Sequence, residues 1–145
     1  GESAAKATSG GWFWHQGETI HSTERLFQMY LETVGRNATL ILNLPPDNSG
    51  ALPEQTVKRM EEFGKELEKR LSTDLAKTAK VTASATRANG AKTTYVADNL
   101  KDDNKDTYWA TDDDVKTATL TFEWDTPQTI RYESMMEYIR LGQRI

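Results

Sequence analysis

The sequence predicts a multidomain chain in which an α/β part precedes an all-β part. Residues 39–44 are apolar and partly β-branched, and they end in a Pro pair and a turn cluster, with helical patterns on both sides. This helix–strand–helix order is typical of α/β proteins. After residue 80 the periodicity becomes alternating, and short strands separated by turns predict a β-sandwich.

The α/β part contains two predicted helices around one predicted strand. The first helix begins at Ser22 or Thr23, either of which can cap it, and ends at Gly35. The run 39–44 predicts a strand buried on both faces, as in a parallel sheet. Pro53 in the first turn opens the second helix, which ends near Ser72. The expected apolar faces are Leu26, Phe27, Tyr30, Leu31 and Val34 in the first helix, and Val57, Met60, Phe63, Leu67 and Leu71 in the second. On the solvent side of the second helix, Glu61 with Lys65 and Glu66 with Arg70 are expected to pair.

The polar, weakly patterned stretch 72–80 is the expected domain boundary, which gives domains 1–74 and 75–145. The clearest strand of the second domain is 117–124, where apolar residues alternate with Thr and Glu. Segments 81–85 and 131–136 are weaker strand candidates. The roughly 65 residues after position 80 suffice for only part of a sandwich.

The composition excludes several classes of function. The chain of 145 residues has no Cys, which excludes disulfides, thiolate metal sites and Cys nucleophiles. Its net charge of −4 and lack of a Lys/Arg block argue against binding to nucleic acid. No apolar run approaches the roughly 20 residues of a membrane span, so none is expected.

Four segments of the first domain carry a family resemblance: 11–15 (GWFWH), 30–37 (YLETVGRN), 40–50 (LILNLPPDNSG) and 57–64 (VKRMEEFG). In this order and spacing they resemble the end of the catalytic (β/α)8 barrel of α-L-fucosidases, glycoside hydrolase family 29. The resemblance implies that the first domain is the C-terminal portion of such a barrel. It further implies that the parent protein is a retaining, exo-acting hydrolase of terminal α-L-fucosyl linkages.

The resemblance also implies which residues contact the sugar. Aromatic faces bind the C–H surface of sugars, and a deoxysugar methyl group needs an apolar wall. Trp12 is expected to line the fucose pocket, with Trp14 and His15 close by; the alternative is that these rings pack beneath the barrel mouth. Asn43, at the end of the predicted strand, is either part of a functional loop or a turn-former before the Pro pair.

Retaining glycosidases need a nucleophile and an acid/base, two carboxyls about 5–5.5 Å apart. The family's Asp nucleophile would lie on a barrel strand outside this chain, so the chain alone is expected to be inactive. The resemblance makes Glu2 the candidate acid/base. Glu18, the other nearby carboxylate, follows the aromatic segment and is expected to be a loop residue.

The second domain resembles the N-terminal half of a coagulation factor 5/8 type C (discoidin) domain, a jelly-roll sandwich, in segments 97–100, 102–113 and 137–145. Many such domains in bacterial glycosidases are carbohydrate-binding modules of family 32. The resemblance implies a possible structural calcium ion, with Asp102, Asn104 and Thr107 offering hard oxygen ligands; the alternative is a solvated acidic loop without metal. Nearby, Tyr108 is a candidate sugar platform, and Trp109 is expected in the core. No cofactor is expected for catalysis.

The expected partners are a fucosylated oligosaccharide or glycoconjugate and the remaining parts of the parent polypeptide. A periplasmic or secreted bacterial location suits that substrate. The alternative from another class is a non-catalytic glycan-binding or adhesion protein built on the discoidin-like module. A third reading treats both domains as scaffolding.

Overall fold

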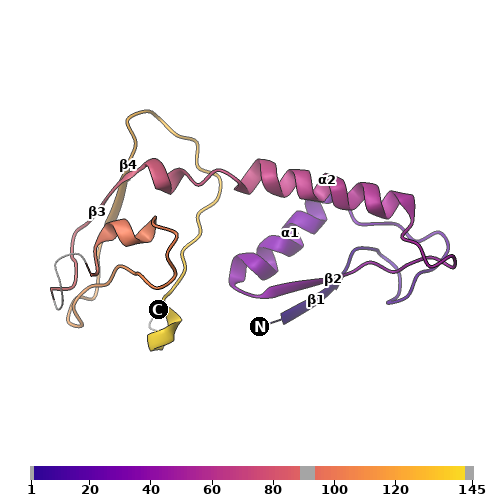
Figure 1. Cartoon of the computed structure of the whole chain (residues 1–145), viewed down its shortest axis with the longest axis horizontal. Helices are drawn as coiled ribbons and strands as arrows, with labels where there is room; N and C mark the ends of the chain where they lie inside the picture. The colour runs from indigo at the N-terminus through magenta and orange to yellow at the C-terminus, as the bar shows by residue number, and fades with distance from the viewer. Residues whose placement is uncertain (1, 89–93, 143–145) are drawn as a thin grey trace. The chain divides into compact units, whose positions relative to one another are not determined.

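A computed structural model of the chain describes residues 2–88 and 94–142 (Figure 1). The chain divides into two compact units, Gly1–Thr73 (unit 1) and Asp74–Ile145 (unit 2). The division falls inside the polar stretch 72–80. No helix in the described ranges has the length and apolar character needed to cross a membrane.

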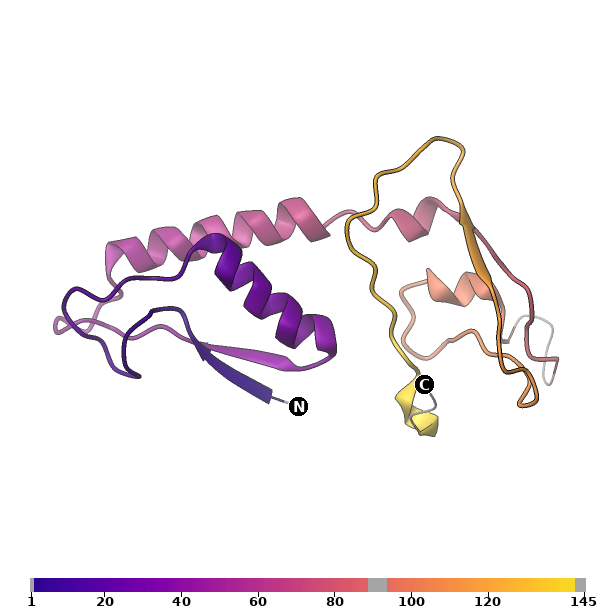
Figure 2. The same ribbon diagram turned by 180° about the vertical axis from the view of Figure 1, so that it is seen from behind.

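Unit 1 has the order β1 (Glu2–Lys6), α1 (Thr23–Thr33), β2 (Thr39–Asn43) and α2 (Glu54–Leu71). The two strands pair in parallel, with Glu2 opposite Thr39 and Lys6 opposite Asn43. A parallel pair needs a crossover connection, and α1 supplies it. Figures 1 and 2 show α1 between the strand pair and α2. This βαβα order confirms the α/β class, and β2 confirms the predicted strand; β1 was not predicted.

The core of unit 1 forms where α1 faces both the sheet and α2. Leu26 and Phe27 of α1 are only 1% exposed, and they cluster with Ala7 and with Phe63 of α2. Burying each large apolar side chain contributes about 1.5–3 kcal/mol. The predicted apolar faces are therefore correct at their centres. At their ends they extend too far, since three of their residues are exposed: Val34, Val57 and Leu71.

The predicted start of α1 is confirmed and its predicted end is wrong in detail. The Ser22 side chain accepts a hydrogen bond from the Arg25 N–H at 3.2 Å, as an N-cap does. The helix continues into a 3-10 turn at Val34–Arg36, and the left-handed residue is Asn37, with φ +60°, rather than Gly35. The N–H groups of residues 37 and 38 bond back to the carbonyls of Val34 and Thr33, which is a Schellman ending.

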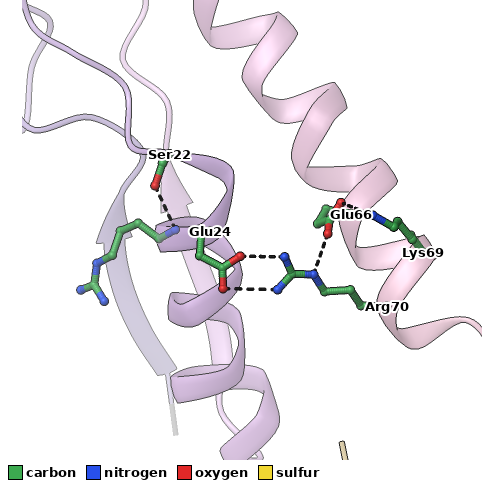
Figure 3. Close-up of polar contacts among 6 residues, drawn as sticks. Ser22, Glu24, Glu66, Lys69 and Arg70 are labelled. Atoms are coloured by element: carbon green, nitrogen blue, oxygen red, sulfur yellow. Dashed lines mark hydrogen bonds and ion pairs between the residues drawn. The ribbon is translucent and has the colours of Figure 1, made fainter. Parts of the chain in front are cut away.

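One guanidinium joins the two helices of unit 1 (Figure 3). Arg70 of α2 pairs with Glu24 of α1 at 2.6 Å and with Glu66 at 2.6 Å, and it lies 4.4 Å from the centre of the Phe27 ring. The predicted Glu66–Arg70 pair is thus confirmed. The pair predicted four residues apart on the same helix, Glu61–Lys65, is not formed.

Unit 2 contains one antiparallel pair, β3 (Lys80–Ala83) with β4 (Leu120–Glu123). Short 3-10 turns lie at Leu75–Thr78, Ala97–Leu100 and Ile139–Leu141. The strands predicted at 81–85 and 117–124 are confirmed over shorter lengths. The strand predicted at 131–136 is wrong: among the described residues this exposed segment forms no strand and joins neither sheet. In the described part of unit 2 these two strands are the only ones, so the structure does not show a sandwich.

Indole N–H groups hold the irregular part of unit 2 together. Trp124 donates to the Leu75 carbonyl at 2.8 Å, and Trp109 donates to the Ala85 carbonyl at 3.1 Å. A half-buried indole that bonds a backbone carbonyl acts as a structural anchor. Trp109 is half-buried rather than part of the buried core that was expected for it.

Candidate functional site

The residues between β1 and α1 form a folded loop, here called the aromatic loop (residues 7–21). Its two limbs meet at a bridge between Thr8 and Ile20, and the N–H of Ser9 donates to the Thr19 carbonyl at 2.8 Å. Thr8 at its base is buried. The limbs are thus joined to each other, and the tip that carries the Trp and His residues projects from a closed base.

Two side chains at the strand ends hold the tip. Lys6, the last residue of β1, donates from Nζ to the Gly10 carbonyl. Asn43, the last residue of β2, donates from Nδ2 to the Trp12 carbonyl at 2.7 Å. Because Lys6 and Asn43 are opposite each other in the register, both contacts come from the carboxyl ends of the parallel strands. Figures 1 and 2 show the segments that follow β1 and β2 at the same end of unit 1.

The predicted sugar-contact residues lie on this tip. Trp12 is 54% exposed, His15 is exposed and Trp14 is half-buried, and none of them belongs to the buried cluster of unit 1. An exposed Trp on a tethered backbone is available to a ligand, and large exposed apolar groups often mark binding surfaces. The structure brings these three residues together with Asn43, whose tethering role the sequence analysis did not foresee.

Glu2 lies away from this group. It is the first residue of β1, whereas the aromatic loop follows the last one, Lys6. At about 3.3 Å per residue, the strand separates their backbones by about 13 Å. Catalytic groups of α/β barrels sit at the carboxyl ends of strands. The carboxylate that the structure does place within the aromatic loop is Glu18, which accepts hydrogen bonds from Thr8 and from the His15 N–H.

The three predicted calcium ligands of unit 2 meet in one tight loop. Asp102 accepts from the Asn104 N–H at 2.8 Å and from the Thr107 hydroxyl at 2.6 Å. These hydrogen bonds lower the pKa of Asp102, and the bond from the Thr107 hydroxyl has the larger effect. Asp103 of the same loop has a left-handed φ of +57° and pairs with Lys77.

The oxygen atoms in this loop are of the kind that a hard cation prefers as ligands. A carboxylate offers about four lone-pair sites, and the amide and hydroxyl oxygens two each, so internal hydrogen bonds leave acceptor capacity. Calcium takes 6–8 oxygens, so peptide carbonyls and water would have to supplement Asp102, Asn104 and Thr107. Within residues 2–88 and 94–142, no three His, Asp or Glu residues group as a metal site.

Three tyrosines form an unforeseen cluster in unit 2. The ring of Tyr108 stacks on Tyr138 with centres 4.3 Å apart, and Tyr95 tilts against it at 5.3 Å. Burial and a hydrogen bond with Tyr95 raise the pKa of Tyr108. One face of the Tyr108 ring is thus occupied by protein. A sugar platform needs only one ring face, so the role of Tyr108 as a platform stays a prediction.

Comparison with known proteins shows what the first unit is similar to. The alpha-L-fucosidase family model matches residues 2–70. Over this segment the chain is similar to the α-L-fucosidase family. The chain is similar to Alpha-L-fucosidase 1 of Arabidopsis thaliana, with 33% identity over 135 residues, which are 93% of this chain and 26% of that protein. An alignment of this length extends into unit 2, so most of both units has a counterpart in that fucosidase.

Solved structures show the same similarity. A Ruminococcus gnavus GH29 fucosidase in complex with fucose matches 82% of this chain and 24% of that chain, with 40% identity and a TM-score of 0.72. A putative alpha-L-fucosidase from Bacteroides thetaiotaomicron matches 83% of this chain and 26% of that chain, with 30% identity and a TM-score of 0.72. The chain thus spans about a quarter of the length of these relatives.

Proposed function

We propose that the protein to which this chain belongs is a retaining, exo-acting α-L-fucosidase, and that the aromatic loop forms part of its fucose pocket. The observation that carries the proposal is the tether from Asn43 to the Trp12 carbonyl, which fixes an exposed Trp at the carboxyl ends of parallel strands. Active sites of α/β barrels gather at that end. The family match of residues 2–70 supports the same reaction.

In this proposal the residues of the aromatic loop make different contacts with the sugar. Trp12 offers an apolar face to the sugar ring and its methyl group, and Trp14 lies beside it. His15 has ring nitrogens that can donate to or accept from sugar hydroxyls. Because Asn43 holds the backbone of Trp12 before any ligand arrives, the sugar does not have to order the loop, and pre-organisation of this kind favours binding.

The proposed chemistry needs two carboxyls about 5–5.5 Å apart. The nucleophile is expected on a part of the protein outside this chain. Glu2 is proposed as the acid/base, and the sequence resemblance is its only support. Glu2 is the first residue of β1. It could act on a substrate only if the substrate extended well below the aromatic loop, or if β1 began at a different residue in the complete protein.

For unit 2 we propose a discoidin-like carbohydrate-binding module with a calcium ion at Asp102, Asn104 and Thr107. The sequence resemblance and the gathered loop oxygens support it. We also propose a periplasmic or secreted bacterial location, where such an enzyme meets glycans; fractionation of cells that produce the tagged complete protein tests it.

One assay tests the proposed reaction. The complete protein should release fucose from an aryl α-L-fucoside, and NMR should detect the α-anomer first, because retention requires it. The chain alone should release none. Glycan binding without any release by the complete protein would reject the enzyme and support the adhesion alternative.

A further inference from the structure

We infer that Glu18 is a positioning residue that shapes the aromatic loop for sugar binding, and that it is not the acid/base. The sugar-binding part of this inference rests on the proposed function. The contacts of Glu18 with Thr8, Gly10 and His15 carry it.

Both carboxylate oxygens of Glu18 face the loop itself. Oε2 accepts from the buried Thr8 hydroxyl at 3.0 Å, and Oε1 faces the His15 N–H at 3.4 Å. The Glu18 N–H donates in turn to the His15 carbonyl at 3.2 Å. Glu18 therefore links the closed base of the loop to its tip. It does so on the limb opposite the tethers from Lys6 and Asn43.

Gly10 leaves the space that the carboxylate fills. A Cβ atom at Gly10 would lie 2.1 Å from Glu18 Oε2 and 3.2 Å from both its Cβ and its Cδ. Relieving the 2.1 Å overlap would require the carboxylate to turn away and so to break its bonds to Thr8 and His15, whereas the 3.2 Å contacts need only a small shift. The φ of Gly10 lies outside the left-handed range, so the backbone conformation does not require a glycine. The close approach of Glu18 is the feature that requires it.

These contacts suit a hydrogen-bond acceptor better than a proton donor. A general acid must hold its proton toward the leaving group of the substrate. The oxygens of Glu18 are instead directed at a hydroxyl and an N–H of its own loop. Its contribution is then to the geometry of the loop tip, because it contacts the backbone of His15 on both its N–H and its carbonyl. A misplacement of about 1 Å can cost on the order of a hundredfold in rate.

The experiment uses the complete protein with Glu18→Ala, Glu18→Gln, Gly10→Ala and the control Glu61→Ala on the exposed face of α2. Glu18→Ala and Gly10→Ala should each lower kcat/KM for an aryl α-L-fucoside about tenfold to a hundredfold, mainly through KM. The double variant should be no worse than Glu18→Ala, because the severe 2.1 Å overlap is with the carboxylate oxygen and the remaining 3.2 Å contact with the Cβ of residue 18 needs only a small shift. Glu18→Gln can still accept from the His15 N–H and donate to the Thr8 oxygen, so it should stay near wild type.

Three readouts separate positioning from acid/base chemistry. The pH–rate profile of Glu18→Ala should keep its shape, azide should not restore its rate, and residues 7–21 should exchange amide hydrogens faster while α2 is unchanged. Azide rescue or loss of one pH limb in Glu18→Ala would overturn the inference. So would unchanged KM and unchanged exchange in both Glu18→Ala and Gly10→Ala.

Different results would reject the proposed function and the inference about Glu18. A wild-type protein that releases no fucose rejects the proposed function, while hydrogen exchange in the aromatic loop still decides whether Glu18 holds it. If Glu18→Ala does not fold, Thr8→Val removes the same hydrogen bond from the other side. It should speed exchange at the loop tip, and unchanged exchange would overturn the inference.

Discussion

The side-chain amide of Asn43 donates a 2.7 Å hydrogen bond to the backbone carbonyl of Trp12, 31 residues earlier in the chain. This bond joins the end of β2 to the loop that follows β1. Only a donor at residue 43 can make it, because the acceptor is a carbonyl oxygen. The side-chain amide of Asn43 therefore has a structural role in addition to that of forming the turn before the Pro pair.

Replacing this donor with an isosteric acceptor should disturb sugar binding. In Asn43→Asp the carboxylate would face the Trp12 carbonyl, so we expect kcat/KM for an aryl α-L-fucoside to fall about tenfold or more. Loss of the bond itself should cost about 1 kcal/mol of stability. Steady-state kinetics of the complete protein measure the first effect. Asn48→Asp, the same change in an exposed turn, is the control, and equal behaviour of the two variants would contradict the tether.

The proposed acid/base is tested by removing its proton. In the complete protein, Glu2→Gln should lose most activity toward substrates with poor leaving groups, and azide should restore turnover of an activated aryl fucoside. Identification of fucosyl azide by NMR is the measurement. Glu61→Gln is the control for the same chemical change. If Glu2→Gln keeps wild-type kinetics, the acid/base lies elsewhere, as the position of Glu2 at the start of β1 already suggests.

The Arg70 bridge predicts how unit 1 responds to acid. Its hydrogen bonds lower the pKa of Glu24 and of Glu66 below the ordinary 4.5. A lowered folded-state pKa contributes stability above 4.5, which is lost as the pH falls through the folded values. Arg70→Gln should therefore be destabilised at neutral pH and lose less than wild type on acidification. Urea unfolding followed by helical circular dichroism measures this.

The control for the bridge is Lys58→Gln, which removes an exposed cation from the same helix. It should leave the pH dependence of wild type unchanged. An Arg70→Gln variant with the wild-type pH dependence would show that these carboxylates gain nothing from the bridge.

The calcium proposal for unit 2 has a thermal signature. A cation that binds the folded loop alone raises Tm, and the rise grows with the logarithm of the cation concentration above its Kd. Adding CaCl2 should raise the Tm of the complete protein, and EDTA should reverse the rise. Asp102→Asn should abolish the shift, whereas the exposed Asp125→Asn should retain it. An unchanged Tm in millimolar calcium would favour the solvated loop without metal.

Local patterns in the sequence predicted both helices and the strands β2, β3 and β4, and they failed where a strand is defined mainly by its pairing. β1 escaped prediction because Ser3, Ala4 and Ala5 carry no strand signal, and it is defined only by its pairing with β2. Conversely, 131–136 has strand-like residues but joins neither sheet of the described chain. The local pattern also marked Gly35 as the helix end, whereas the turn uses Asn37, which tolerates the left-handed conformation.

For the candidate site, the sequence predicted the aromatic segment and not the contacts that hold it. Trp12, Trp14 and His15 stood out by their density. The tether from Asn43 and the contact between Gly10 and Glu18 join residues whose proximity depends on how the loop folds back. No pattern of neighbouring residues encodes such contacts.

The most direct measurement of the central claim is the KM of Trp12→Ala for an aryl α-L-fucoside in the complete protein, compared with Phe13→Ala. Phe13 is the adjacent aromatic and is 77% exposed. Loss of a buried apolar contact of about 1.5–3 kcal/mol should raise the KM of Trp12→Ala about tenfold to a hundredfold. Phe13→Ala should remain close to wild type. Equal, near-wild-type KM values for both variants would contradict the assignment of the aromatic loop to the fucose pocket.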